Sequence, residues 1–113
     1  MQKVIYKYEL NFKSVTTIEM PKSAEVLTIQ MQNGIPCIWA KHNPDQEKQL
    51  RTFMLIGTGH SFEDFGNLNY IGTIQDSYYV FHCFELGLLK STNSKNIVHG
   101  NITNVGEFRL GDG

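Results

Sequence analysis

The feature that most constrains the fold is an alternation of apolar and polar residues with a period of two. In Lys3–Leu10 the even-numbered positions are all apolar or aromatic, whereas three of the four odd-numbered positions are charged. A period of two is typical of a β-strand with one buried face. Val15–Met20 has the same β-rich character, and no long stretch has helical periodicity. The sequence therefore predicts a mostly β domain: a small antiparallel sheet, sandwich or barrel-like, with at most one short helix.

Two hairpins are predicted from turn residues between alternating runs. Asn33-Gly34 separates Glu25–Gln32 from Ile35–His42, and Asn-Gly suits a type I′ turn because both central residues there need positive φ. A second hairpin is expected around Asp76-Ser77, between 68–75 and 78–86.

The run Leu50–Gly57 carries apolar residues on both faces, which indicates a central strand. The short helix is expected at Ser61–Phe65, because Ser61 can cap its first turn and two acidic residues follow.

The composition divides the chain into two parts. Residues 1–86 form the β-rich domain, whereas residues 87–113 hold five of the 10 glycines and four asparagines. We expect this second part to be a C-terminal accessory segment, either a tail or an extra hairpin. A length of 113 residues fits one compact domain.

The charge and the apolar patterning exclude several classes of protein. Ten basic residues balance 11 acidic ones, for a net charge of −1, whereas nucleic-acid binders usually carry a basic excess. No apolar run is long enough to cross a membrane, and the N-terminal residues lack the apolar segment of a signal peptide. We therefore expect a cytoplasmic protein with no nucleic-acid or membrane partner, in which Cys37 and Cys83 are reduced.

Metal-binding and catalytic motifs are missing from the sequence. Neither a Cys-x-x-Cys pair nor a His-Glu-x-x-His helix occurs. His82 and Cys83 are neighbours on an expected strand, so they point to opposite faces and cannot readily share an ion. No nucleophile elbow or cysteine-protease signature is present. We expect no metal, no cofactor and no enzymatic activity. The candidate ligands behind this interpretation are His42, His60, His82, His99, Cys37 and Cys83.

One segment could bind an anion. Gly57, Thr58, Gly59 and His60 leave an expected strand just before Ser61 and the expected helix. Such a turn can direct backbone N–H groups and a hydroxyl at a phosphate. The alternative interpretation is a tight turn that uses glycine only for positive φ.

Arg51 and Trp39 extend the anion hypothesis. Arg51 lies in an otherwise apolar strand, where a guanidinium needs a carboxylate or a bound anion. Trp39, the single tryptophan, is expected on a strand near Arg51. Aromatic stacking plus phosphate capture would suit a nucleotide-like ligand. The candidate ligand-binding residues are Trp39, Arg51, Gly57, Thr58, Gly59 and His60.

An ordered set of motifs resembles a small family of uncharacterised phage and prophage proteins, a domain of unknown function. The resemblance covers about residues 3–86. The motifs, in order, are IYKYEL (5–10), TIEMPK (17–22), QMQNGIPCIWA (30–40), RTF (51–53), GTGH (57–60), YIGT (70–73) and VFHCFE (80–85).

The resemblance implies an accessory protein made by a phage inside a bacterial cell, with no catalytic residue to carry over. The leading expectation is a non-enzymatic protein that sequesters a nucleotide-derived second messenger of anti-phage immunity. A homo-oligomer is expected, because a small domain encloses a ligand better at a subunit interface. The first alternative is an inhibitor that binds a host defence protein through Tyr70, Tyr78 and Tyr79. A phosphodiesterase using His60 and a metal is the second.

Overall fold

The computed structural model describes residues 2–13 and 15–87 of the chain. These residues form seven β-strands joined by turns and irregular loops, and no helix occurs among them. The C-terminal segment expected from Gly87 onward lies outside the described residues, apart from Gly87 itself. The strands are β1 (Val4–Glu9), β2 (Val15–Pro21), β3 (Glu25–Gln32), β4 (Ile35–His42), β5 (Lys48–Gly57), β6 (Leu68–Asp76) and β7 (Tyr79–Leu86).

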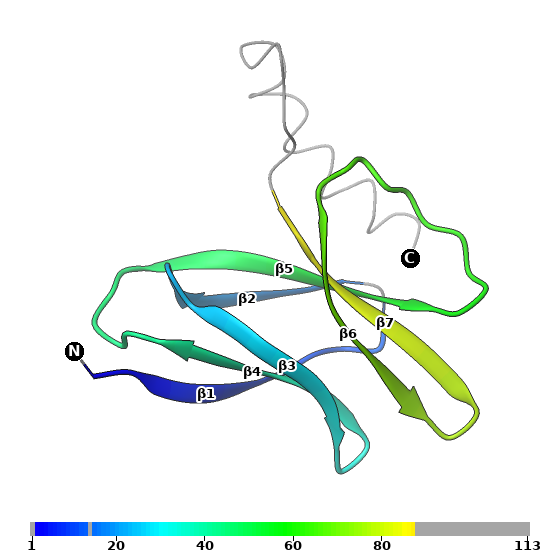
Figure 1. Cartoon of the computed structure of the whole chain (residues 1–113), viewed down its shortest axis with the longest axis horizontal. Coiled ribbons are helices and arrows are strands. Elements are labelled where there is room, and N and C mark those ends of the chain that lie inside the picture. The colour runs from blue at the N-terminus through cyan, green and yellow to red at the C-terminus, as the bar shows by residue number, and fades with distance from the viewer. Residues whose placement is uncertain (1, 14, 88–113) are drawn as a thin grey trace.

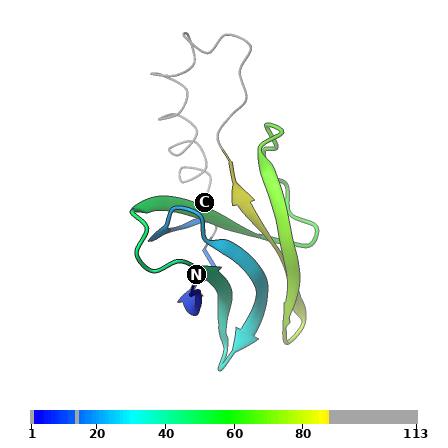
Figure 2. The same cartoon turned by 60° about the vertical axis from the view of Figure 1, so that its left-hand side comes forward.

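The strands make two antiparallel sheets, in the orders β1-β4-β3 and β2-β5-β7-β6 (Figure 1). The expected mostly β, antiparallel fold is therefore confirmed, as two open sheets and not as a closed barrel. The sheets are in contact where β3 lies against β6, and Figure 2 shows the two layers from the side.

Both expected hairpins are present. Asn33 and Gly34 have φ values of 53° and 79°, which are the two positive angles that a type I′ turn requires. In the second hairpin Asp76 pairs with Tyr79, so the turn consists of Ser77 and Tyr78, with Ser77 at φ 57°.

The short helix expected at Ser61–Phe65 is wrong. Residues 58–67 form an irregular loop between β5 and β6. The Gly66 N–H donates to Asp64 Oδ1 at 2.8 Å, and Gly66 has φ 82°. Asp64 thus closes a local turn with its own side chain, which competes with helix formation.

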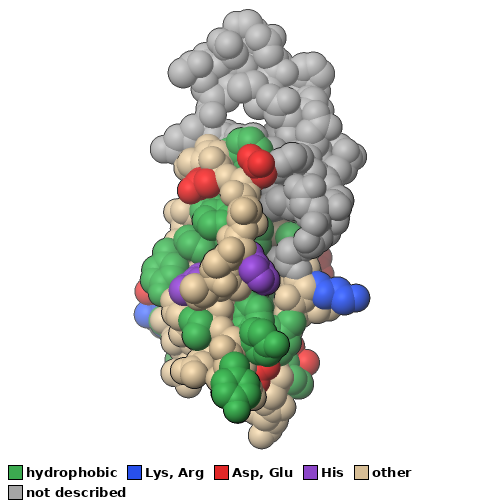
Figure 3. Space-filling model, turned by 90° about the vertical axis from the view of Figure 1, so that its right-hand side faces the viewer, with side chains coloured by type: hydrophobic (Ala, Val, Ile, Leu, Met, Phe, Trp, Pro, Cys, Tyr) green, Lys and Arg blue, Asp and Glu red, His purple; other side chains and the backbone are tan. Residues whose placement is uncertain are grey.

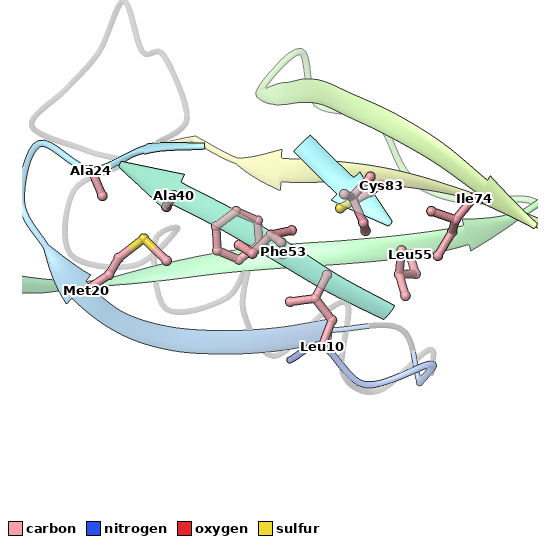
Figure 4. Close-up of a cluster of buried hydrophobic side chains, with 10 residues drawn as sticks. Leu10, Met20, Ala24, Ala40, Phe53, Leu55, Ile74 and Cys83 are labelled. Atoms are coloured by element: carbon pink, nitrogen blue, oxygen red, sulfur yellow. The ribbon is translucent and has the colours of Figure 1, made fainter. Parts of the chain in front are cut away.

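The core lies between the two sheets (Figure 4). Ile38 of β4 and Phe53 of β5 are 0% and 1% exposed and form its centre. At one point the sheets come unusually close: a Cβ added to Gly72 would lie only 2.9 Å from Ile29 Cγ2. Glycine in β6 therefore lets β3 pack directly against the strand backbone. The buried apolar side chains of the cluster are Leu10, Met20, Ala24, Ile29, Ile38, Ala40, Phe53, Leu55, Ile74 and Cys83.

Candidate functional site

The segment Gly57–His60 is a tight turn that continues β5 toward the irregular loop. The His60 N–H donates to the Gly57 carbonyl at 3.1 Å, and Gly59 has φ 90°. The Thr58 N–H donates to the Val80 carbonyl of β7 at 3.0 Å. The segment is therefore a tight turn in which Gly59 has a positive φ, and two of the amides that an anion would need are already engaged within the protein.

This turn borders a groove on the outer face of the four-stranded sheet, the face turned away from the core. The groove has a volume of about 220 Å³. Figure 3 shows histidine and hydrophobic side chains gathered on one side of the molecule. We call this site the aromatic groove; it is lined by Ile56, Gly57, Thr58, Gly59, His60, Phe62, Tyr70, His82 and Phe84.

Phe84 of β7 is the central aromatic residue of the groove. Its ring lies 5.5 Å from that of Tyr70 on β6, with the planes at 60°, and 6.2 Å from that of Phe62 in the 58–67 loop. Tyr70 and Phe62 are 60% and 47% exposed. The three rings therefore present aromatic surface to solvent from two strands and a loop.

His82 of β7 holds a hydrogen-bonded chain across the strands. Its Nε2 lies 2.7 Å from Thr58 Oγ1, and its Nδ1 lies 3.0 Å from Thr73 Oγ1. Thr73 Oγ1 is in turn hydrogen-bonded to the Tyr70 hydroxyl. Because hydroxyls can donate or accept, either neutral tautomer of His82 can be satisfied here. Both ring nitrogens are engaged, so the imidazole is fixed in orientation beside Phe84.

His60 closes the other side of the groove by packing on Gly57. A Cβ added to Gly57 would lie 3.1 Å from His60 Nδ1 and 3.2 Å from its Cε1. The glycine at this position therefore gives the imidazole room to rest against the backbone of β5.

Arg51 does not reach the aromatic groove. It points into the space between the sheets, where its Nε and Nη2 donate to Glu85 Oε2 and Oε1 at 2.6 and 2.9 Å. Its Nη1 donates to the Ala24 carbonyl at 2.6 Å. The hydrogen bonds to Glu85 are the largest cause that raises the pKa of Arg51. Of the two partners expected for the Arg51 guanidinium, a carboxylate or a bound anion, the structure shows a carboxylate.

Trp39 also lies away from the groove. It is on β4, opposite Lys7 of β1 and Thr28 of β3. The expectation that Trp39 and Arg51 are near neighbours in one sheet is wrong, because β4 and β5 belong to different sheets. The consecutive strands β4 and β5 do not pair, because the chain crosses from one sheet to the other between them.

Of the six candidate ligand-binding residues, the structure thus brings together only Gly57, Thr58, Gly59 and His60. Sequence reasoning missed the aromatic and imidazole side chains that complete the groove. A signal was present in β7, where His82 and Phe84 alternate with the buried Cys83 and must share the opposite face. The residues that were missed are Ile56, Phe62, Tyr70, His82 and Phe84.

The remaining histidine and cysteine side chains of the described chain do not assemble into a metal centre. Among residues 2–13 and 15–87, no three His, Cys, Asp or Glu side chains are placed to hold an ion. Cys37 and Cys83 are unpaired and buried, and burial raises the pKa of Cys83 to about 12. Within the same residues, no helix has the length and hydropathy needed to cross a membrane.

The fold and the site define a two-sheet antiparallel β-domain with an aromatic groove on its outer face. The chain belongs to a family described as a domain of unknown function (DUF7352), whose model matches residues 1–93. This match extends the expected range of 3–86 at both ends. No curated protein and no solved structure matches the chain significantly.

Proposed function

We propose that this protein is a non-enzymatic binding protein whose aromatic groove receives the base of a nucleotide-derived second messenger. In this proposal a phage makes it in the cytoplasm of a bacterial cell, where it sequesters a signal of anti-phage immunity. The observation that carries the proposal is the grouping of Phe62, Tyr70 and Phe84 around one groove. Exposed aromatic rings of this kind stack on planar bases, by about 1–3 kcal/mol per base.

The size of the groove limits how much of a nucleotide it holds. Its volume of about 220 Å³ is below the roughly 300–1,000 Å³ typical of pockets for whole drug-sized ligands. It therefore suits one planar ring, with the sugar and phosphate outside. The hydroxyl of Thr58, which lines the groove and is hydrogen-bonded to His82, can make a further polar contact to the edge of such a ring.

The phosphate must be held differently from what the sequence suggested. Arg51 is occupied by Glu85, and among the described residues that line the groove there is no lysine or arginine. His60 is the exposed imidazole at the groove edge and can donate to a phosphate there. Binding should therefore depend more on stacking than on charge, with weak dependence on salt.

Calorimetry against a panel of cyclic dinucleotides, ADP-ribose derivatives and free nucleosides tests the proposal. We expect at least one nucleotide to bind without chemical change, and Phe84→Ala to reduce its affinity by tenfold or more, about 1.4 kcal/mol. Tyr79→Ala, which removes an aromatic ring from the far end of β7, is the matched control and should leave binding unchanged. If no member of the panel binds, the proposal fails; if one is converted to product, the protein is an enzyme.

A second candidate function is direct inhibition of a host defence protein. The β6–β7 turn presents Tyr78 and Tyr79, which are 96% and 66% exposed, and exposed tyrosines are frequent anchors of protein interfaces. Pull-down from host lysate with the wild type and with Tyr78→Ser/Tyr79→Ser tests this function. One host protein captured in stoichiometric amount by the wild type alone supports it, and equal capture by both excludes this turn as the anchor.

A further inference from the structure

In the part of the chain that the structure describes, each sheet has two edge strands, and an edge strand can pair with another chain. The four edge strands are β1, β3, β2 and β6. Open edges invite pairing unless a bulge, a proline or a covering loop interrupts them.

Three of these edges carry such an interruption. In β3 the register shifts between Val26 and Thr28, and in β6 it shifts between Tyr70 and Gly72, so each strand has a bulge. The β2 strand ends in Pro21, and the Asn11 N–H donates to its Thr16 side chain at 2.9 Å.

The fourth edge, β1, is uninterrupted. It pairs with β4 in continuous register from Val4 to Glu9, without a bulge, proline or glycine. Figure 1 shows β1 along the outer rim of the described fold. Two large apolar side chains on it are solvent-exposed, Ile5 at 57% and Tyr6 at 51%. We propose that β1 is a dimerisation edge, on which β1 of a second copy of this chain pairs antiparallel about a two-fold axis at Tyr6.

Backbone hydrogen bonding restricts the register of such a dimer. The Leu10 N–H donates to the Pro36 carbonyl at 2.8 Å, in phase with the β1–β4 pairing. Because bonding alternates along an antiparallel ladder, the even-numbered residues of β1 bond to β4. The N–H and C=O groups of Ile5, Lys7 and Glu9 therefore point outward. Two such edges can pair only when odd-numbered residues oppose odd-numbered residues, which places the two-fold axis on a residue and not between two.

Charge and strand overlap together select among the allowed registers. An axis at Tyr8 would place Lys7 opposite the partner subunit's Glu9, but only residues 7–9 of the two β1 strands would then overlap. With the axis at Tyr6, Lys3 lies opposite the partner subunit's Glu9, and symmetry repeats this pair. With the axis at Ile5, Lys3 would oppose the partner subunit's Lys7. With the axis at Lys7, that lysine would oppose its own copy. Like charges directly opposite each other destabilise a sheet, whereas opposite charges stabilise it. The Tyr6 register also places Tyr6 against the partner subunit's Tyr6, in the closely spaced pair of the ladder.

Analytical ultracentrifugation of the full chain tests the proposal. We expect a concentration-dependent dimer, and we expect Ile5→Pro to be monomeric. The Ile5 N–H faces outward, so proline there leaves the β1–β4 ladder intact and removes a donor from the dimer. A wild type that stays monomeric up to its solubility limit overturns the proposal, as does a folded Ile5→Pro protein that still dimerises.

Charge reversal supplies a test that does not depend on the proline variant folding. Lys3→Glu or Glu9→Lys alone should weaken the dimer by about tenfold or more, because each converts two attractive pairs into repulsive ones. The double variant Lys3→Glu/Glu9→Lys should restore wild-type association. Glu19→Lys, which makes the same charge change on the β2 edge, is the control and should have no effect. Failure of the double variant to recover overturns the register.

A cysteine scan reads the register directly. Tyr6→Cys should form an intersubunit disulfide under mild oxidation, because Cα atoms in the closely spaced pair lie about 4.5 Å apart, within the range of a disulfide. Lys7→Cys should not, since it lies opposite the partner subunit's Ile5. The native Cys37 and Cys83 are 1% and 0% exposed and should not interfere. Preferential cross-linking of Lys7→Cys would contradict the Tyr6 axis.

Discussion

The ion pair between Arg51 and Glu85 gives the sharpest test of the packing. The loss of stability when the pair is broken shows whether Arg51 has a structural role or is free to bind a ligand. The two side chains are only 13% and 19% exposed, and two hydrogen bonds of 2.6 and 2.9 Å join them. A third bond, to the Ala24 carbonyl, ties Arg51 to the residue that precedes β3 in the other sheet. The pair therefore links β5 to β7 within one sheet and holds Arg51 in place to bond the chain that enters the other sheet.

Glu85→Gln should destabilise the fold strongly. The substitution leaves a largely buried guanidinium without its counter-ion, and breaking a buried pair in this way costs about 3–5 kcal/mol. The two side chains remain partly exposed to water, which reduces this cost, so we expect a loss of about 3 kcal/mol in the free energy of unfolding. For a domain of this size that corresponds to a fall in Tm of roughly 10–20 °C.

Thermal and urea unfolding followed by circular dichroism measures the effect. Glu25→Gln is the matched control, because Glu25 pairs with Lys41 at 3.4 Å on the surface, with 64% and 44% of the two side chains exposed; such pairs contribute about 0–1 kcal/mol. The apolar double variant Arg51→Met/Glu85→Leu should recover much of the lost stability. If Glu85→Gln is no more destabilising than Glu25→Gln, Arg51 does not depend on Glu85 and the structural assignment is refuted.

Three further predictions concern the core and its titratable groups. Gly72→Ala should lower the free energy of unfolding by about 1–3 kcal/mol through contact with Ile29, and Gly72→Ala/Ile29→Ala should show less than the summed losses in urea titrations. His42 is 1% exposed, and burial, followed by the charge of Lys48, lowers its pKa. As the pH falls, His42 is therefore protonated in the unfolded chain before it is protonated in the folded protein. Its contribution to the free energy of unfolding should be constant at high pH and decline as the pH falls below about 6.5; His42→Gln should flatten that decline. Cys83, 0% exposed and with its pKa raised to about 12, should react with a thiol reagent only in denaturant, as should Cys37; rapid labelling of the native protein would contradict the packing.

The elements that depend on local signals could be predicted from the sequence. Asn33-Gly34 specifies its own turn, and the alternation in Lys3–Leu10 marks β1 because period-two patterning needs no knowledge of distant residues. The two-sided apolar pattern of Leu50–Gly57 likewise indicated a central strand, and β5 does lie between β2 and β7.

The candidate site depended on long-range pairing, which the sequence does not encode in any short window. Consecutive strands in the sequence place Trp39 near Arg51, whereas in the structure the chain crosses between sheets after β4. Phe62 and Phe84 are brought together by an irregular loop and a strand that are more than twenty positions apart. The helix expected at Ser61–Phe65 failed because the Asp64 side chain bonds the Gly66 N–H instead.

NMR of the side chains tests most directly whether a planar ring binds in the aromatic groove. Aromatic and imidazole resonances would be followed while a bound nucleotide from the calorimetric panel is added. We predict large shifts for Phe62, Tyr70 and Phe84, and none for the indole of Trp39, which lies in the other sheet. Shifts at Trp39 with the three groove rings unmoved would contradict binding in the groove.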